Sequence, residues 1–142
     1  MAYSNTAYSN YGKYLETEVY SADPVKLVCM LYRGAIEATA AARRHLKAGE
    51  IRERSKEILR AMDILRELNR SLDPKYKEIS VPLSDLYNYM LRQMIQANAK
   101  QIDAPMAEVE QLLTTLHDGW KASTPVAVAA GSETYQPVSC TY

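Results

Sequence analysis

Residues 50–72 read EIRERSKEILRAMDILRELNRSL and carry the clearest structural signal in the chain. One line of residues at helical spacing contains Ile51, Ile58, Met62, Leu65, Asn69 and Leu72. Residues at this spacing share one side of an α-helix, and an apolar side must pack against other helices to be buried. Gly49 precedes the stretch and Asp73-Pro74 follows it, and both are typical of helix ends. The stretch therefore predicts one long helix with a single packing seam.

Three other stretches repeat this pattern. The first begins at Asp23-Pro24, where an acidic cap followed by proline suits a first helical turn. The next starts between Ser80 and Ser84, and the last follows Asp103-Ala104-Pro105. Their seams contain Leu27, Leu31, Gly34, Ala35, Ala38 and Ala42, then Leu83, Tyr87, Met90, Met94 and Ala97, and finally Met106, Val109, Leu113, Leu116 and Trp120. Four such helices with short connections predict an all-α fold, an antiparallel four-helix bundle over residues 23–122.

The two ends of the chain have a different composition. Residues 1–22 contain the repeat Ala-Tyr-Ser-Asn and further tyrosines, a polar and aromatic composition that cannot bury a core by itself. Residues 123–142 contain three prolines and show no sustained helical period. We therefore expect a mobile N-terminal arm and a disordered C-terminal tail.

The charges exclude one class of partner. Lysine plus arginine and aspartate plus glutamate number 17 each, so no net field attracts nucleic acid or an anionic membrane. Basic residues nevertheless concentrate in residues 43–60 and acidic ones in residues 101–142. This asymmetry fits charge pairing between helices better than a ligand site.

No constellation of residues predicts catalysis, a cofactor or a metal site. His45 and His117 are the only histidines, and neither has the carboxylate spacing of a bundle metal centre. Asp85, Glu108 and Glu110 are interpreted as solvated charges. No phosphate-binding loop or nucleophile motif is present, so we expect a protein that is not an enzyme.

Several features predict a cytoplasmic protein. The two cysteines, Cys29 and Cys140, form no disulfide framework, and Cys29 is interpreted as a small apolar filler. The first 22 residues lack the pattern of a signal peptide, and no apolar stretch is long enough to insert into a membrane.

A second apolar stripe is the most informative anomaly. It contains Val25, Cys29, Tyr32 and Ile36, and it lies more than about 100° around the first helix from the main seam. A weaker flank on the third helix contains Leu91, Ile95 and Ile102. Either these stripes form a groove for a partner helix, or a wide apolar face simply reaches both neighbouring helices. The groove interpretation makes Val25, Cys29, Tyr32, Ile36, Leu91 and Ile95 the candidate partner-binding residues.

The order of several short motifs resembles a known family. They are Tyr14 ahead of Val19, Ser21-Ala22-Asp23-Pro24, Leu27, Met30-Leu31-Tyr32-Arg33-Gly34-Ala35, Leu65 to Asn69, Ser71-Leu72-Asp73, Leu86-Tyr87-Asn88-Tyr89-Met90, Ala97-Asn98 and Trp120. Together they resemble the flagellar secretion chaperone family, FliS, over about three quarters of the chain. The segment Lys75-Tyr76-Lys77-Glu78 departs from the family pattern, and the arm before Tyr14 is longer than that pattern requires.

The resemblance implies a function. It implies a cytoplasmic chaperone that binds the disordered C-terminal region of flagellin, prevents premature polymerisation and delivers flagellin to the type III export gate. The alternative is a four-helix dimerisation or adaptor module unrelated to flagella, which would self-associate through the second stripe.

Two further expectations follow from the groove interpretation. Tyr32→Asp and Ile36→Asp should weaken client binding more than they unfold the bundle, whereas Leu31→Asp should do the reverse. An arm containing Tyr14 and Val19 should cover the groove until a client displaces it.

Overall fold

The computed structural model describes residues 24–129, and the side chains of residues 24–122. It contains the four helices α2 (Pro24–Ala48), α3 (Ile51–Arg70), α4 (Lys77–Lys100) and α5 (Ala104–Ala129), and no strand in the described part of the chain. The all-α, four-helix prediction is therefore confirmed. The predicted arm, residues 1–22, lies outside the described residues, as does the tail from residue 130. Helix α5 continues past the predicted boundary at Ala122 to Ala129.

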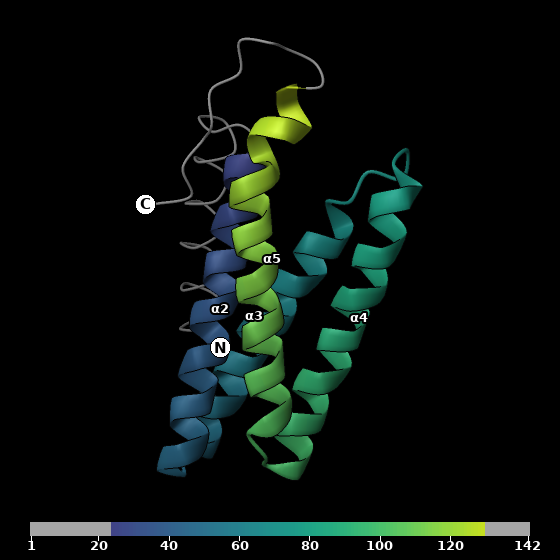
Figure 1. Cartoon of the computed structure of the whole chain (residues 1–142). Helices are drawn as coiled ribbons and strands as arrows, with labels where there is room; N and C mark the ends of the chain where they lie inside the picture. The colour runs from purple at the N-terminus through teal and green to yellow at the C-terminus, as the bar shows by residue number, and fades with distance from the viewer. Residues whose placement is uncertain (1–23, 130–142) are drawn as a thin grey trace, which may run out of the picture. The chain divides into compact units, whose positions relative to one another are not determined.

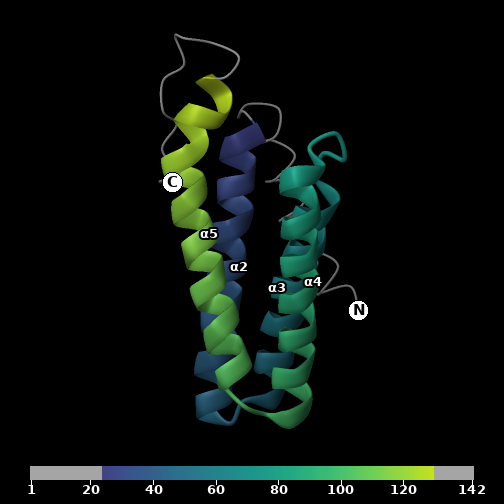
Figure 2. The same ribbon diagram turned by 45° about the vertical axis from the view of Figure 1, so that its right-hand side comes forward.

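The described residues belong to two compact units. One comprises residues 31–119, and the other includes residues 24–30 and 120–129. Within residues 31–119 the four helices run alternately up and down side by side, which is the antiparallel arrangement that the sequence predicts (Figures 1 and 2). Short connections between consecutive helices explain this topology.

Two residues with positive φ end helices within the bundle. Gly49 follows α2 with φ +75°, and its N–H donates to the carbonyl of Leu46, 3.1 Å away. Gln101 follows α4 with φ 56°, and its N–H donates to the carbonyl of Ala97. Both use the left-handed conformation to satisfy carbonyl groups in the last turn of a helix. The prediction that Gly49 separates the first two helices is confirmed.

Helix α4 begins earlier than predicted, at Lys77 instead of between Ser80 and Ser84. The carboxylate of Asp73 accepts a hydrogen bond from the N–H of Lys75, forming a turn ahead of the helix. The carbonyl of Tyr76 then accepts the N–H of Ser80 at 2.8 Å, so the first helical turn precedes Pro82. Proline lacks an N–H group and removes one helical hydrogen bond without ending this helix.

The core of residues 31–119 contains the predicted seams. Its buried apolar residues include Leu31, Ala35, Ala38, Ala42, Ile58, Met62, Leu65, Leu68, Tyr87, Met90, Met94, Ala97, Met106, Val109 and Leu113. One seam residue was wrongly predicted, because Ile51 is 56% exposed at the start of α3. Burying each large side chain contributes about 1.5–3 kcal/mol. The bundle is therefore held by its seams, which leaves surface positions free for binding.

Candidate binding surface

Exposed large apolar side chains lie on two neighbouring helices. In the described part of the chain they are Ile51, Leu59, Tyr76, Ile79, Val81, Ile95 and Ile102. Six of them belong to α3, α4 or the segment that joins these helices, and Ile102 lies just after α4, in the connection to α5. Scattered apolar residues need no explanation on a protein surface, but a contiguous group of them indicates an interaction site.

Four of these side chains surround one hydrogen-bonded contact between α3 and α4. On α3, Ser55 is flanked one turn away on either side by Ile51 and Leu59, whose exposed fractions are 56% and 55%. Asn98 of α4 has Ile95 three residues before it on the helix and Ile102 four residues after it in the connection to α5, exposed by 55% and 41%. The hydroxyl of Ser55 donates to Oδ1 of Asn98 at 3.2 Å, which sets the two helices in register. We call Ile51, Leu59, Ile95 and Ile102 with Ser55 and Asn98 the α3–α4 face.

Arg54 supports this face from the interior. Its side chain is only 4% exposed, and its Nε donates to Oδ1 of Asn98 at 3.1 Å. Its Nη2 donates to the main-chain carbonyl of Asn98, 3.5 Å away. Asn98 lies in the last turn of α4, where the unpaired carbonyls carry partial negative charge and favour a cation. The buried guanidinium is therefore held by a helix terminus and one carboxamide, with no carboxylate bonded to it among the described residues.

A second polar contact joins α3 and α4 farther along the pair. Nδ2 of Asn69 on α3 donates to Oδ1 of Asn88 on α4 at 3.5 Å. The half-buried Leu91 follows Asn88 by three residues and precedes Ile95 by four, so it extends the apolar line along α4. Of the predicted partner-binding residues, Leu91 and Ile95 thus lie on the helix that packs against α3, which carries the exposed Leu59 that sequence reasoning missed. The four-residue spacing of Ser55 and Leu59, which places both on one side of α3, was the sequence signal that could have identified Leu59.

The stripe predicted on α2 is placed differently. Cys29 and Tyr32 are fully buried, whereas Val25 and Ile36 are half-buried. The Tyr32 hydroxyl forms a hydrogen bond with the Tyr87 hydroxyl of α4, so a wide apolar face, and no open groove, accounts for Tyr32. Burial and the adjacent Tyr32 hydroxyl raise the pKa of Tyr87 above its ordinary value.

Three other predicted residues need comment. Cys29 is fully buried among the core residues, as its interpretation as a small apolar filler requires. The proposed groove-covering residues Tyr14 and Val19 lie outside the described residues. The partner-binding role of the α2 residues stays a prediction.

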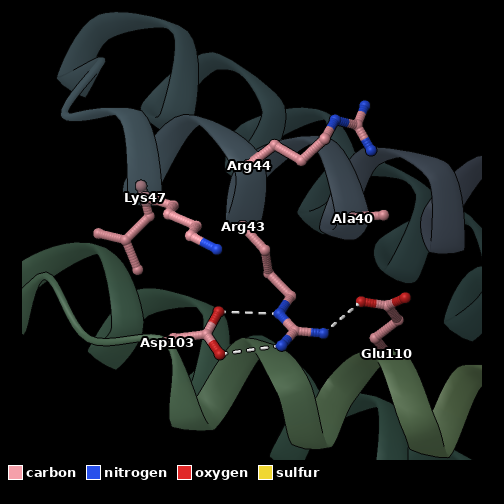
Figure 3. Close-up of a pocket in the computed structure, with 7 residues that line it drawn as sticks. Ala40, Arg43, Arg44, Lys47, Asp103 and Glu110 are labelled. Carbon is pink, nitrogen blue, oxygen red and sulfur yellow. Dashed lines mark hydrogen bonds and ion pairs between the residues drawn. The ribbon is translucent and has the colours of Figure 1, made fainter.

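A second polar cluster joins α2 to α5 (Figure 3). Nε and Nη2 of Arg43 donate to the two carboxylate oxygens of Asp103 at 2.8 and 2.9 Å, and Nη1 donates to Glu110 at 2.8 Å. These hydrogen bonds raise the pKa of Arg43 and lower that of Asp103. The charge pairing between helices that the sequence predicted is confirmed at this cluster. Glu110 was wrongly interpreted as solvated.

The same cluster lines a surface cavity of about 580 Å³. Its lining residues are Ala40, Arg43, Arg44, Leu46, Lys47, Asp103 and Glu110. Arg44 extends away from the two carboxylates (Figure 3). Both carboxylates that line this cavity are hydrogen-bonded to Arg43, so the cluster serves to join α2 to α5.

Glu108 was likewise interpreted as a solvated charge. Glu108 is exposed, as this interpretation requires, and its carboxylate also accepts hydrogen bonds from the Tyr89 hydroxyl at 2.6 Å and from Nε2 of Gln93 at 2.9 Å. These contacts join α4 to α5 and raise the pKa of Tyr89. Within the described residues, no three side chains of metal-binding type cluster together. None of the described helices is both long and apolar enough to span a bilayer.

Comparison with known proteins identifies relatives along most of the chain. The family model described as flagellar protein FliS matches residues 7–127. The flagellar secretion chaperone FliS of Salmonella typhimurium is 36% identical over 115 residues, which cover 80% of this chain and 85% of the relative. Its namesake in Bacillus subtilis is 32% identical over 111 residues, covering 78% and 83%. The Escherichia coli FliS is 33% identical over 119 residues, covering 82% and 86%.

Proposed function

This chain belongs to the FliS family of flagellar secretion chaperones, and from that premise we propose that it is a cytoplasmic chaperone for flagellin. It binds the disordered C-terminal region of flagellin and prevents premature polymerisation. It then delivers flagellin to the flagellar type III export apparatus. The resemblance found in the sequence and the names of the relatives support this proposal.

The observation that carries the proposal is the α3–α4 face. Its four apolar side chains are each between 41% and 56% exposed, and each is within four residues of the Ser55–Asn98 contact along its own segment. A client helix with apolar residues at positions i, i+4 and i+7 would bury them. Such a segment of flagellin gains helical structure as it binds, and the entropy lost in ordering it keeps the affinity adjustable.

The predicted partner-binding residues fall into two groups in this proposal, those that are exposed enough to contact the client and those that are buried. Leu91 and Ile95 contact the client directly, together with Leu59. Val25 and Ile36 are half-buried, so only the exposed part of each side chain is available to the client. Cys29 and Tyr32 are fully buried, so they would contact the client only if the packing around α2 opened. We retain as a proposal that the arm bearing Tyr14 and Val19 covers the apolar surface in the free protein.

Co-expression with flagellin from the same bacterium tests the proposal. The bundle should co-purify with full-length flagellin and elute with it as a one-to-one complex in light scattering. Flagellin that lacks its C-terminal segment should be lost from the complex. Separate elution of full-length flagellin at tens of micromolar would contradict the proposal, and self-association of the bundle alone would favour the dimerisation module.

A further inference from the structure

The carboxamide of Asn98 has a fixed orientation. The Nε–H of Arg54 can only donate a hydrogen bond, so the Asn98 atom 3.1 Å from it must be the oxygen. The Ser55 hydroxyl donates to the same oxygen. The amide nitrogen of Asn98 therefore lies on the other side of the group and carries two donor hydrogens. No acceptor for this nitrogen exists among the described residues.

This donor lies within the apolar surface. Asn98 is partly exposed, with Ile95 one turn before it on α4 and Ile102 just after the end of that helix. Its partner Ser55 on α3 lies one helical turn from Ile51 and from Leu59. In the free protein, water can accept from Nδ2. A partner that covers the four apolar side chains removes this water, and the donor becomes costly unless the partner supplies an acceptor.

We propose that Asn98 is a specificity-determining residue of the α3–α4 face: its Nδ2 donates to a main-chain carbonyl of the client segment. The inference rests on the proposed function, because the client is the C-terminal region of flagellin. The carbonyl must be unused within the client, as at the C-terminal end of a bound helix or in an extended stretch. Asn98 thereby fixes the register in which the client lies on the face.

The surroundings favour a neutral carbonyl over a client carboxylate. A carboxylate here would lose its hydration among four aliphatic side chains, and burial of an ion costs more than burial of an amide. Arg54 cannot compensate by direct contact, because its side chain is 4% exposed and lies beneath Asn98. Its charge instead polarises the Asn98 carboxamide and strengthens the outward donor.

The contacts of Arg54 and Ser55 with Asn98 also reduce the entropy that Asn98 loses when its Nδ2 donates to a client. Arg54 and Ser55 hold the Asn98 oxygen, and Arg54 also approaches the Asn98 main-chain carbonyl. The side chain is thus held in one orientation before a client arrives, so little rotamer entropy is lost on binding.

The variant Asn98→Asp separates the inward and outward roles of this side chain. The substitution keeps an acceptor for Arg54 and Ser55, now as a charge-assisted contact, but replaces the outward donor by an acceptor. We expect an unchanged or higher melting temperature and about tenfold or greater weakening of flagellin binding in calorimetry. The matched control Gln96→Glu makes the same charge change at an exposed position of α4 outside the face, and it should change the affinity by less than about twofold.

A second measurement uses the unmodified protein. The side-chain amide protons of Asn98 can be assigned in an NMR spectrum by their absence in Asn98→Asp. One of them should shift when the flagellin C-terminal segment is added, while the Gln96 amide pair should not. An Asn98 pair that stays unshifted at saturation, or wild-type affinity in Asn98→Asp, would overturn the inference and leave the proposed function standing. Failure of the wild-type protein to bind flagellin would overturn both.

Discussion

Tyr32 on α2 and Ile95 on α4 are both large apolar side chains on the flank of a bundle helix, yet they have opposite environments. Tyr32 is 0% exposed and its hydroxyl bonds to Tyr87, whereas Ile95 is 55% exposed beside other uncovered apolar side chains. The first is part of the core that keeps the helices together. The second belongs to a surface that the bundle leaves open. Core packing and the recognition that we propose thus belong to different flanks of the same fold.

The largest expected effect comes from charging the buried flank. Tyr32→Asp places an unpaired carboxylate in the core and should destabilise the bundle by about 3–5 kcal/mol, measured by urea denaturation with circular dichroism. Burial thus reverses the expectation from sequence that this variant mainly weakens client binding. Tyr32→Phe removes the hydroxyl that bonds to Tyr87 and should cost about 1–3 kcal/mol. A native urea midpoint for Tyr32→Asp would mean that Tyr32 is not core.

Removing the buried support of the open surface should have an intermediate effect. Arg54→Met keeps an apolar stem but leaves Asn98 Oδ1 and the carbonyls at the end of α4 with fewer donors. We expect a loss of about 1–3 kcal/mol in the free energy of unfolding. Arg66→Met is the control, because Arg66 is half exposed and pairs only with Asp63 one turn away. Equal losses in the two variants would contradict the support role of Arg54.

Charging the open flank should change binding and not folding. Ile95→Asp should reduce flagellin affinity by about tenfold or more and change the free energy of unfolding by less than about 0.5 kcal/mol. Ile79→Asp is a matched control on the same helix, because Ile79 is 60% exposed and lies outside the α3–α4 face. Similar losses of affinity in both variants would show that the face has no special role.

The smallest expected effect concerns the ion pairs of Arg43. Arg43→Met should cost less than about 1 kcal/mol at neutral pH, because the Arg43 and Asp103 side chains are 35% and 48% exposed and water screens them. Arg43 lowers the pKa of Asp103 in the folded state. This stabilisation is therefore complete above the unfolded pKa of about 3.9 and is lost as the pH falls through the folded value. Urea titrations should show the wild-type advantage shrinking below about pH 4, and an advantage independent of pH would contradict this assignment.

Part of the candidate surface was predictable from local spacing. The line of Leu91, Ile95 and Ile102 was predicted from residue spacing, and Ile95 and Ile102 are exposed in the structure. The placement of Ile102 on the helix was wrong, because α4 ends at Lys100 and Ile102 lies in the connection to α5. Leu59 and Arg54 were not identified. An apolar and a basic residue on a helix are each compatible with core, solvent or a partner, and only their neighbours on α4 decide between these environments.

By itself, the sequence determined that this chain forms four helices with these seams. Apolar spacing and helix-ending residues such as Gly49 act within a few positions of one another, so their effect needs no knowledge of the rest of the fold. The tertiary structure alone decided which flank is covered and where each charge is paired. Tyr32 meets Tyr87 across 55 positions, and Arg43 meets Asp103 across 60. Burial depends on which helices become neighbours, a property of the packed bundle that no single helix contains.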